Sequence, residues 1–490
     1  MTRRLLFLIL ALAVVSPLSL SAQSAKPPQV IVIEGRRDAG EAAVSTKSIV
    51  YLRFDVPEGV TGIQVKKEIK VNAEPGERLS RDHALFDPRG YEFPGKGFRG
   101  SKAGGWPDFM ITGDPATTSR WLAPGPIYPG TWHLMQWLRM CPKSGLSYKY
   151  TITLSFDGPA PPTDMPAVPP YDPGIINPKR DWYPGNLHAH TYHSDGSKSL
   201  AEVVERAEAQ GFSFLALTDH NSVLTHHEFA EVGRAHPKFL LLCGEEFTSP
   251  YGHANIIGMR AGEWFDFRVD SGDGRLPRII DMAHESGAVF SVNHPYSTCL
   301  TCLWRFLGSE WTKADAVEVW SGPFGDHDRR AVDLWESMLR FGKHINAFGG
   351  SDYHTGDGAW TPAVWVYAEN LSQPAVMDAL RKGRIFLSDG LNGPKVFLSV
   401  RGRSALPGDT IEPDEDGTVP VEVRVIGGKG MTLRLIWLGS EINLPVETDY
   451  AVLSHAVPVN TTHSYVRAEL LRPDGGMAAL TNPIYVGRPN

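Results

Sequence analysis

The stretch GNLHAHTYHSDG (residues 185–196) decides the expected fold, because it places His188 and His190 directly after a short strand-like segment. A strand sends alternate side chains to opposite faces, so these two histidines share a face and can bind one ion. Other histidines and acids also follow short apolar runs. They occur in LALTDHN (215–221), GEEFT (244–248), GHANIIG (252–258), VNHP (292–295) and GGSDYH (349–354). Spread over so much of the chain, they predict one polynuclear metal site.

Strand-like and helical segments alternate through this part of the chain. Ser199 and Glu202 form a capping box at the start of a helical pattern that Gly211 ends, and the strand-like run FSFLAL (212–217) follows. The same order recurs before VNHP and before GGSDYH. This alternation predicts a parallel α/β sheet or barrel, whose active site lies at the carboxyl ends of its strands.

The flanking segments have a different pattern. Residues 27–160 contain strand-like runs separated by turns rich in proline and glycine, which predicts a β-sandwich. Residues 161–180 form a proline-rich linker, and residues 391–490 return to alternating β runs. We therefore expect an α/β domain over residues 181–390 between two all-β domains.

The motifs HAHTYHSDG, TDHN, GEEFTSPYGH, NHP and GSDYH, in this order, resemble those of the polymerase and histidinol phosphatase (PHP) metallohydrolases. Within that family they resemble the secreted carbaryl-hydrolase-like branch. The resemblance covers roughly residues 181–390 and implies a distorted (β/α)7-type barrel as the core. It also implies two or three divalent ions, which the residue types allow to be zinc, manganese or iron.

The resemblance implies which residues hold each ion. The first ion would be bound by His188, His190, Glu246 and Asp352. Glu246 would bridge to a second ion bound by His253 and His294. A third ion would be bound by Asp195, His220 and His354.

Each candidate ligand also has a structural interpretation. A lone histidine at a strand end is more often a hydrogen-bonded residue than a ligand, but the ordered set reverses that expectation. Asp195 lies in an SDG sequence, where an aspartate can simply form a turn. Glu245 and Glu246 point to opposite sides of a strand, and the family pattern G-x-E-x-T selects Glu246.

Four nearby residues are expected to be outside the coordination shell. Asp219 either orients His220 or caps the following turn. His193, His226 and His227 are expected to be structural.

Length and composition place the chain among globular proteins of two or three domains, with 490 residues of which 42% are hydrophobic. The segment MTRRLLFLILALAVVSPLSLSA (1–22) is typical of a signal peptide, which predicts a secreted or periplasmic protein without a stable membrane anchor. The formal net charge is −7. This acidic balance disfavours duplex nucleic acid as a partner and leaves a small-molecule substrate as the expectation, with the oligomeric state open.

The cysteines do not form a disulfide scaffold, because the chain has only four of them. Cys299 and Cys302 form a CxxC directly after NHP, and a loop disulfide and two free thiols are both open interpretations. Cys141 and Cys243 are expected to be buried as small hydrophobic residues.

These features predict a secreted metal-dependent hydrolase in which a metal-bridging hydroxide attacks the substrate. The residues expected to carry catalysis are His188, His190, His220, His294 and Asp352. A phosphoester is the first expectation for the substrate, because clustered cations match the oxygens of a phosphoryl group. A carbamate, ester or amide is the alternative, and a pocket lined by Trp304, Phe306 or Trp320 would favour an aryl leaving group. A non-catalytic envelope or polysaccharide-binding protein is the third.

Overall fold

The computed structural model describes residues 26–102, 107–459 and 463–487. Over these residues the protein is a mixed α/β protein with many strands and few helices, as the sequence predicts. Residues 1–22, the expected signal peptide, lie outside the described part. None of the described helices is long and apolar enough to span a membrane.

The N-terminal strands form two four-stranded antiparallel sheets, with orders β1-β8-β3-β6 and β2-β7-β4-β5. Their shared core contains Phe54, Ile63, Trp132 and Ile152, all almost fully buried. The alternating burial of β8 follows from the alternating apolar residues of LSYKYTITLS. The strands are β1 (Gln29–Arg37), β2 (Ile49–Val56), β3 (Gly62–Val71), β4 (Ser80–Phe86), β5 (Phe98–Lys102), β6 (Phe109–Thr112), β7 (Gly130–Met140) and β8 (Leu146–Ser155).

The central strands follow the order β15-β14-β13-β12-β11-β10-β9-β16-β17 in one large sheet. β9, β10 and β11 are parallel, and so are β13, β14 and β15, while β12 runs antiparallel between these groups. A parallel bridge between Ala189 and Tyr353 brings the chain beyond β9 against the chain beyond β15. The strands are β9 (Asp181–Asn186), β10 (Phe214–Leu217), β11 (Leu240–Ser249), β12 (Gly252–Ile257), β13 (Val289–Val292), β14 (Ala316–Ser321), β15 (Asn346–Gly350), β16 (Ala363–Ala368) and β17 (Ile385–Ser388).

The described residues contain five α-helices, which all connect central strands and pack their apolar faces against them. α1 begins at the capping box of Ser199 and Glu202 and ends at Gly211, which adopts a left-handed conformation. Buried Leu200, Val203 and Val204 give it one apolar face. The helices are α1 (Leu200–Gln210), α2 (Phe229–Ala235), α3 (Arg275–Glu285), α4 (Asp326–Arg340) and α5 (Gln373–Lys382). Short 3-10 helices occupy Ala39–Glu41, Thr46–Ser48, Leu224–His227 and Gly308–Glu310.

The C-terminal strands continue the central sheet. β25 pairs with β17 in antiparallel fashion, and β24, β21 and β22 extend the sheet from β25. A separate sheet has the order β18-β20-β23. The strands are β18 (Lys395–Val400), β19 (Thr410–Ile411), β20 (Thr418–Ile426), β21 (Thr432–Trp437), β22 (Ser440–Pro445), β23 (Tyr450–Pro458), β24 (His463–Leu471), β25 (Met477–Thr481) and β26 (Ile484–Gly487).

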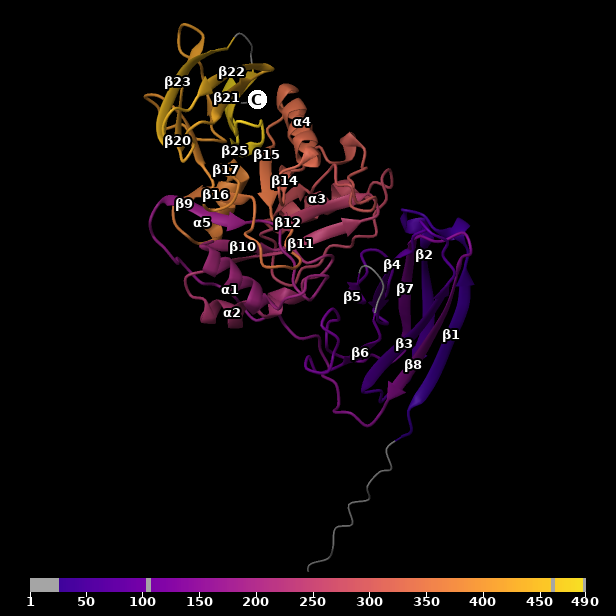
Figure 1. Ribbon diagram of the computed structural model, residues 1–490. Helices are drawn as coiled ribbons and strands as arrows, with labels where there is room; N and C mark the ends of the chain where they lie inside the picture. Colours follow the sequence, from indigo (N-terminus) through magenta and orange to yellow (C-terminus); the bar gives the residue numbers. More distant parts are fainter. Residues whose placement is uncertain (1–25, 103–106, 460–462, 488–490) are drawn as a thin grey trace, which may run out of the picture.

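Figure 1 shows the two β-rich regions on different sides of the central region, with the C-terminal strands next to α4 and the N-terminal strands on the far side. The N-terminal region packs against the segment WFDFRV (264–269). Phe86 and Trp137 belong to the same buried cluster as Phe265 and Phe267 of that segment. An apolar interface therefore fixes the N-terminal sheets against the central region.

Candidate metal centre

The nine candidate ligands predicted from sequence come together at one end of the central sheet. His188, His190 and Glu246 have fully buried side chains, whereas about a third of the side-chain surface of Asp195, Asp352 and His354 is exposed. The cluster is thus deep on one side and open on the other. Among the described residues, four overlapping groups of side chains at this cluster, one of which includes Glu318, have ligand atoms close enough to share an ion: His190, Asp195, His220 and His354; His188, His190 and Asp352; His188, His294 and Glu318; and His220, Glu246 and His253.

His188 and His190 lie just beyond β9 and both face Asp352. Their Nε2 atoms are 3.2 and 3.1 Å from Asp352 Oδ1, and the same two atoms are 3.4 and 3.5 Å from the carboxylate oxygens of Glu246. The two histidines therefore point toward one space, as expected of the first ion's ligands, although their backbone has already left the strand.

Glu246 lies at the centre of the cluster. Its Oε1 is 3.2 Å from His253 Nδ1 and 3.2 Å from His294 Nε2, and its Oε2 is 2.7 Å from His220 Nδ1. Both carboxylate oxygens of Glu246 therefore face histidine nitrogens. The structure thus places His220 nearer to Glu246 than the grouping implied by the resemblance.

Asp195 and His354 form the open side of the cluster. Asp195 Oδ1 is 3.2 Å from His354 Nε2, and Asp195 Oδ2 is 3.6 Å from His220 Nε2. His190 is nearby, with its Nδ1 4.0 Å from Asp195 Oδ1. These four side chains form the group nearest to the solvent.

Short-range backbone geometry brings the two halves of the cluster together. Asn186 Oδ1 accepts hydrogen bonds from the backbone N–H groups of His188 and Ser351, which links the chain after β9 to the chain after β15. A Cβ atom on Gly350 would lie 2.3 Å from His188 Cβ, so only glycine permits this approach. The GGSD sequence is therefore required for packing as well as for presenting Asp352.

Three residues at the site have strained backbones. His294, Asp352 and Asn221, which follows His220, have positive φ angles of 25°, 49° and 49°. Non-glycine residues rarely adopt this region, and such strain concentrates at functional sites. The surrounding fold therefore holds these side chains in position, and this costs backbone conformational energy.

The carboxylates and histidines of the cluster shift one another's pKa values. Burial alone would raise the pKa of Glu246, but His220, His188 and His253 lower it well below its usual range. Burial would likewise raise the pKa of Asp352, and His188 and His190 lower it. Burial lowers the pKa of His253 to about 4 and also lowers that of His190, despite the nearby carboxylates. Burial would also lower the pKa of His220, but Glu246 and Asp195 raise it to about 10. Carboxylates bind metal ions when ionised and imidazoles when neutral, so His220 must lose a proton to bind an ion.

Buried polar atoms without a hydrogen-bond partner agree with a divalent-ion site. Two buried ring nitrogens of the cluster, His253 Nε2 and His294 Nδ1, make no hydrogen bond with the described residues. Such orphaned atoms are costly unless another partner satisfies them. Imidazole and carboxylate donors converging in this way are those chosen by zinc, manganese and iron.

Glu318 is a buried acid at the site that the sequence did not reveal. It lies in β14, where Oε1 is 2.8 Å from His188 Nδ1 and Oε2 accepts the backbone N–H of His294. A carboxylate on the second nitrogen of a histidine fixes the ring orientation and raises its basicity. A single acid within the apolar run AVEVW was the one local signal of this role.

A cavity of about 370 Å³ opens onto the cluster. Its wall contains the hydroxyl residues Ser297, Thr298 and Ser321 and the disulfide-linked pair Cys299–Cys302. Trp304, Phe306 and Trp320, which the sequence suggested as an aryl pocket, are absent from the described lining. Trp320 is fully buried, with its indole N–H donated to the Gly322 carbonyl.

The other residues that the sequence singled out have structural contacts. The Asp219 carboxylate accepts hydrogen bonds from Thr191, Ser194 and Thr225, so it orders the loop before Asp195 rather than the His220 ring. Glu245 points away from the cluster and accepts the backbone N–H of Phe265.

The remaining histidines and cysteines are also accounted for. His193 bridges Glu228 and the Arg120 carbonyl, His226 is buried against Gly244, and His227 is half-buried. Cys243 is buried as expected, whereas Cys141 is half-buried.

The chain resembles several solved structures at low sequence identity. None of the curated proteins matches it. A two-domain protein from Bacteroides vulgatus that contains a predicted PHP-like metal-dependent phosphoesterase is 16% identical, with 65% of this chain and 100% of that chain covered and a TM-score of 0.38. A candidate metal-dependent phosphoesterase from Bifidobacterium adolescentis is 16% identical (38% and 92% covered, TM-score 0.28). An amidohydrolase from Chromobacterium violaceum is 17% identical (35% and 87% covered, TM-score 0.28). Residues 186–264, which carry the ligand candidates from His188 to His253, match the model of the PHP domain.

Proposed function

We propose that the protein is a metal-dependent phosphoesterase that hydrolyses a small phosphomonoester or phosphodiester. The observation that carries the proposal is the polar cavity of about 370 Å³ whose floor is the His, Asp and Glu cluster. The PHP domain match over residues 186–264 agrees with this class of chemistry. The distorted (β/α)7-type barrel and the relationship to the carbaryl-hydrolase-like branch are part of the same proposal.

The residues would divide into metal-binding and substrate-binding groups. His188, His190, Asp195, His220, Glu246, His253, His294, Asp352 and His354 would hold two or three ions of zinc, manganese or iron. Ions of this kind lower the pKa of water to about 7 and so supply hydroxide at neutral pH. Glu318 would keep His188 oriented through its hydrogen bond at 2.8 Å.

The cavity wall favours a phosphoryl group over an aryl ester. Ser297, Thr298 and Ser321 can donate hydrogen bonds to non-bridging oxygens at the mouth of the site. His327 also lines the mouth, with its Nε2 3.2 Å from Asp328 Oδ2, and its ring can exchange a proton with a leaving group. An aryl leaving group would need an apolar wall. Trp304, Phe306 and Trp320 are not among the residues that line this cavity.

The cellular location belongs to this proposal as well. Residues 1–22 have the pattern of a signal peptide, so the enzyme would act in the periplasm or outside the cell. The Cys299–Cys302 disulfide is compatible with an oxidising compartment.

The test measures metal content per chain together with turnover of p-nitrophenyl phosphate, bis(p-nitrophenyl) phosphate and an aryl carbamate, each with manganese and with zinc. We expect two or three ions and phosphoester turnover. Asp352→Asn and His188→Ala should each lower turnover by more than about 100-fold, since even partners outside the coordination shell are worth 10- to 100-fold. Asp333→Asn, an exposed acid of α4, is the matched control.

Two results would overturn this assignment. Turnover of the carbamate alone would move the protein to carbamate and ester hydrolysis. A protein that binds no metal and turns over none of the three substrates would instead be a binding protein.

A further inference from the structure

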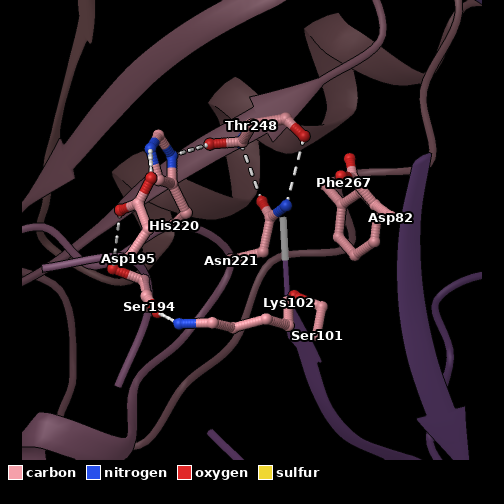
Figure 2. A pocket seen from close by; sticks show the side chains of 9 residues that line it. All are labelled: Asp82, Ser101, Lys102, Ser194, Asp195, His220, Asn221, Thr248 and Phe267. Carbon is pink, nitrogen blue, oxygen red and sulfur yellow. Dashed lines mark hydrogen bonds and ion pairs between the residues drawn. The ribbon is translucent and has the colours of Figure 1, made fainter. Parts of the chain in front are cut away.

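The N-terminal region contacts the loop that carries Asp195. Lys102, the last residue of β5, donates a hydrogen bond from Nζ to the Ser194 carbonyl, as Figure 2 shows. His193 Nδ1 lies 2.5 Å from the Arg120 carbonyl oxygen and donates to it. The Arg120 guanidinium lies 4.6 Å from the ring centroid of Tyr192. Three consecutive residues of this loop are therefore held from the N-terminal region.

This loop leads directly into the metal cluster. Asp195 follows Ser194, and its carboxylate is 3.2 Å from His354 and 3.6 Å from His220. Ser194 is also held by its side chain, because its Oγ donates a hydrogen bond to Asp219 Oδ1 at 2.6 Å. A shift of the Ser194 backbone would therefore displace Asp195 from its two histidines.

A second contact route reaches His220. The ring of Phe98, the first residue of β5, stacks on Trp264 with centroids 3.9 Å apart and planes 7° apart. The Trp264 indole N–H donates to the Asn221 carbonyl at 3.2 Å, and the Asn221 side chain is bonded to the Thr248 backbone. Asn221 follows His220 and has a strained φ of 49°. The N-terminal region thus supports Asn221, whose backbone conformation orients His220.

Both routes meet at one small internal space. A cavity of about 20 Å³ is lined by Ser101 and Lys102 from β5 and by Asp195 and His220 from the cluster (Figure 2). This space is too small for a substrate, since it holds about one water molecule. Lys102 therefore acts on the loop rather than on a substrate bound in the larger cavity.

The other side of the cluster is held within the central region. Glu318 of β14 binds the His188 ring and the His294 backbone. Asn186 holds the backbones of His188 and Ser351. The ligands supported from the N-terminal region, Asp195 and His220, belong to one group with His190 and His354.

We propose that the N-terminal β region is a clamp that completes one of the metal positions, with Lys102 as a positioning residue for Asp195. The inference rests on the metal centre of the proposed function. It adds that the binding of one ion depends on the N-terminal region being docked against the central region. If the N-terminal region moves away, the group of His190, Asp195, His220 and His354 loses its geometry, while the group of His188, His294 and Glu318 keeps its own. Affinity for a single ion thereby becomes coupled to the interface.

The test uses full-length protein stripped with a chelator and titrated with Co²⁺, whose visible spectrum reports the coordination of each equivalent. Lys102→Met removes the hydrogen-bond donor and keeps most of the side-chain length. We expect one Co²⁺ equivalent to bind about 10-fold more weakly, with a changed spectrum for that equivalent only. Lys102→Arg, which keeps a cationic donor, should restore most of the affinity. Lys66→Met, an exposed lysine of β3, is the matched control.

The outcomes separate this proposal from the proposed function. Unchanged binding of every equivalent in Lys102→Met, or an equal loss for all of them, would refute the clamp. A wild-type protein that binds no Co²⁺ would instead refute the metal centre itself. Because a fold defect could mimic the expected loss, thermal unfolding of the metal-free variant must match that of the metal-free wild type.

Discussion

The two β-rich regions are joined to the central region by different interactions. The C-terminal strands are part of the central sheet, because β25 pairs with β17 through backbone hydrogen bonds. Asn482 adds two hydrogen bonds to the backbone of Ala347 in β15. The N-terminal region shares no sheet with the central strands among the described residues. It is held by side chains such as Phe98 and Lys102.

The two regions also differ in where they act. The C-terminal contacts reach residues 344–347, at the amino end of β15, whereas Asp352 follows its carboxyl end. The N-terminal contacts reach Ser194 and Asn221, which adjoin candidate ligands. The C-terminal region is therefore placed to stabilise the fold, and the N-terminal region to affect the site.

The largest effect is expected from Arg467→Met, which tests the C-terminal half of this comparison. Arg467 is 2% exposed and pairs with Glu336 of α4 and with Glu469 of its own strand, both at 2.7 Å. Removing one partner of a buried ion pair leaves an uncompensated charge and costs about 3–5 kcal/mol. We expect that loss in the free energy of unfolding, measured by denaturant titration, with metal stoichiometry at 25 °C unchanged.

The control for this variant is Arg401→Met, an exposed arginine of the same region, whose effect should stay within about 0.5 kcal/mol. If Arg467→Met were to remove an ion while leaving stability intact, the assignment of the C-terminal region to stability would be wrong.

The same junction predicts a sensitivity to acid. Burial raises the pKa of Glu469, but Arg467 and Arg434 outweigh burial and lower it from 4.5 to about 2. A lowered folded-state pKa contributes stability that is complete above the unfolded pKa and is lost as the pH falls toward 2. We expect a loss on the order of 3 kcal/mol from this group between about pH 4.5 and pH 2.

Glu469→Gln isolates this contribution. The variant should be less stable than the wild type at pH 7, and the difference in unfolding free energy should shrink below about pH 4.5. A difference that stayed constant from pH 7 to pH 2.5 would show that Glu469 does not titrate in this range.

The difference between the two regions also shows which features could be predicted from the sequence. The mixed α/β class is confirmed, because periodic helices and strand-like runs are local features. Most site residues could be selected from sequence because their motifs follow strand-like runs, and the carboxyl ends of neighbouring parallel strands meet. Glu246 lies instead within β11, and His253 lies at the start of the antiparallel strand β12. The structure brings all nine site residues together. Their binding of metal stays a prediction.

Contacts between segments far apart in the chain could not be predicted from local sequence patterns. Glu318 sits in an apolar strand and resembles any isolated acid, and Lys102 is one of 48 basic residues. The pairing of Ser388 with Ala479 joins segments far apart in the chain, so no local spacing announces that the C-terminal strands extend the central sheet. The aromatic residues Trp304 and Trp320 follow NHP in the chain, yet neither is among the residues that line the cavity.

The smallest effect is expected from Phe98→Ala, which tests the N-terminal half of the comparison. The substitution removes the stack on Trp264, which is about half-buried, and should cost about 1–2 kcal/mol at the interface. Because Trp264 holds the Asn221 carbonyl, one Co²⁺ equivalent should bind a few-fold more weakly, and the linker at residues 161–180 should be cleaved faster in limited proteolysis. Phe341→Ala, at an 87% exposed phenylalanine of the central region, should change neither property. If Phe98→Ala leaves both unchanged, the interface does not act on His220. The support for the open side of the cluster would then come from Lys102 and Arg120 alone.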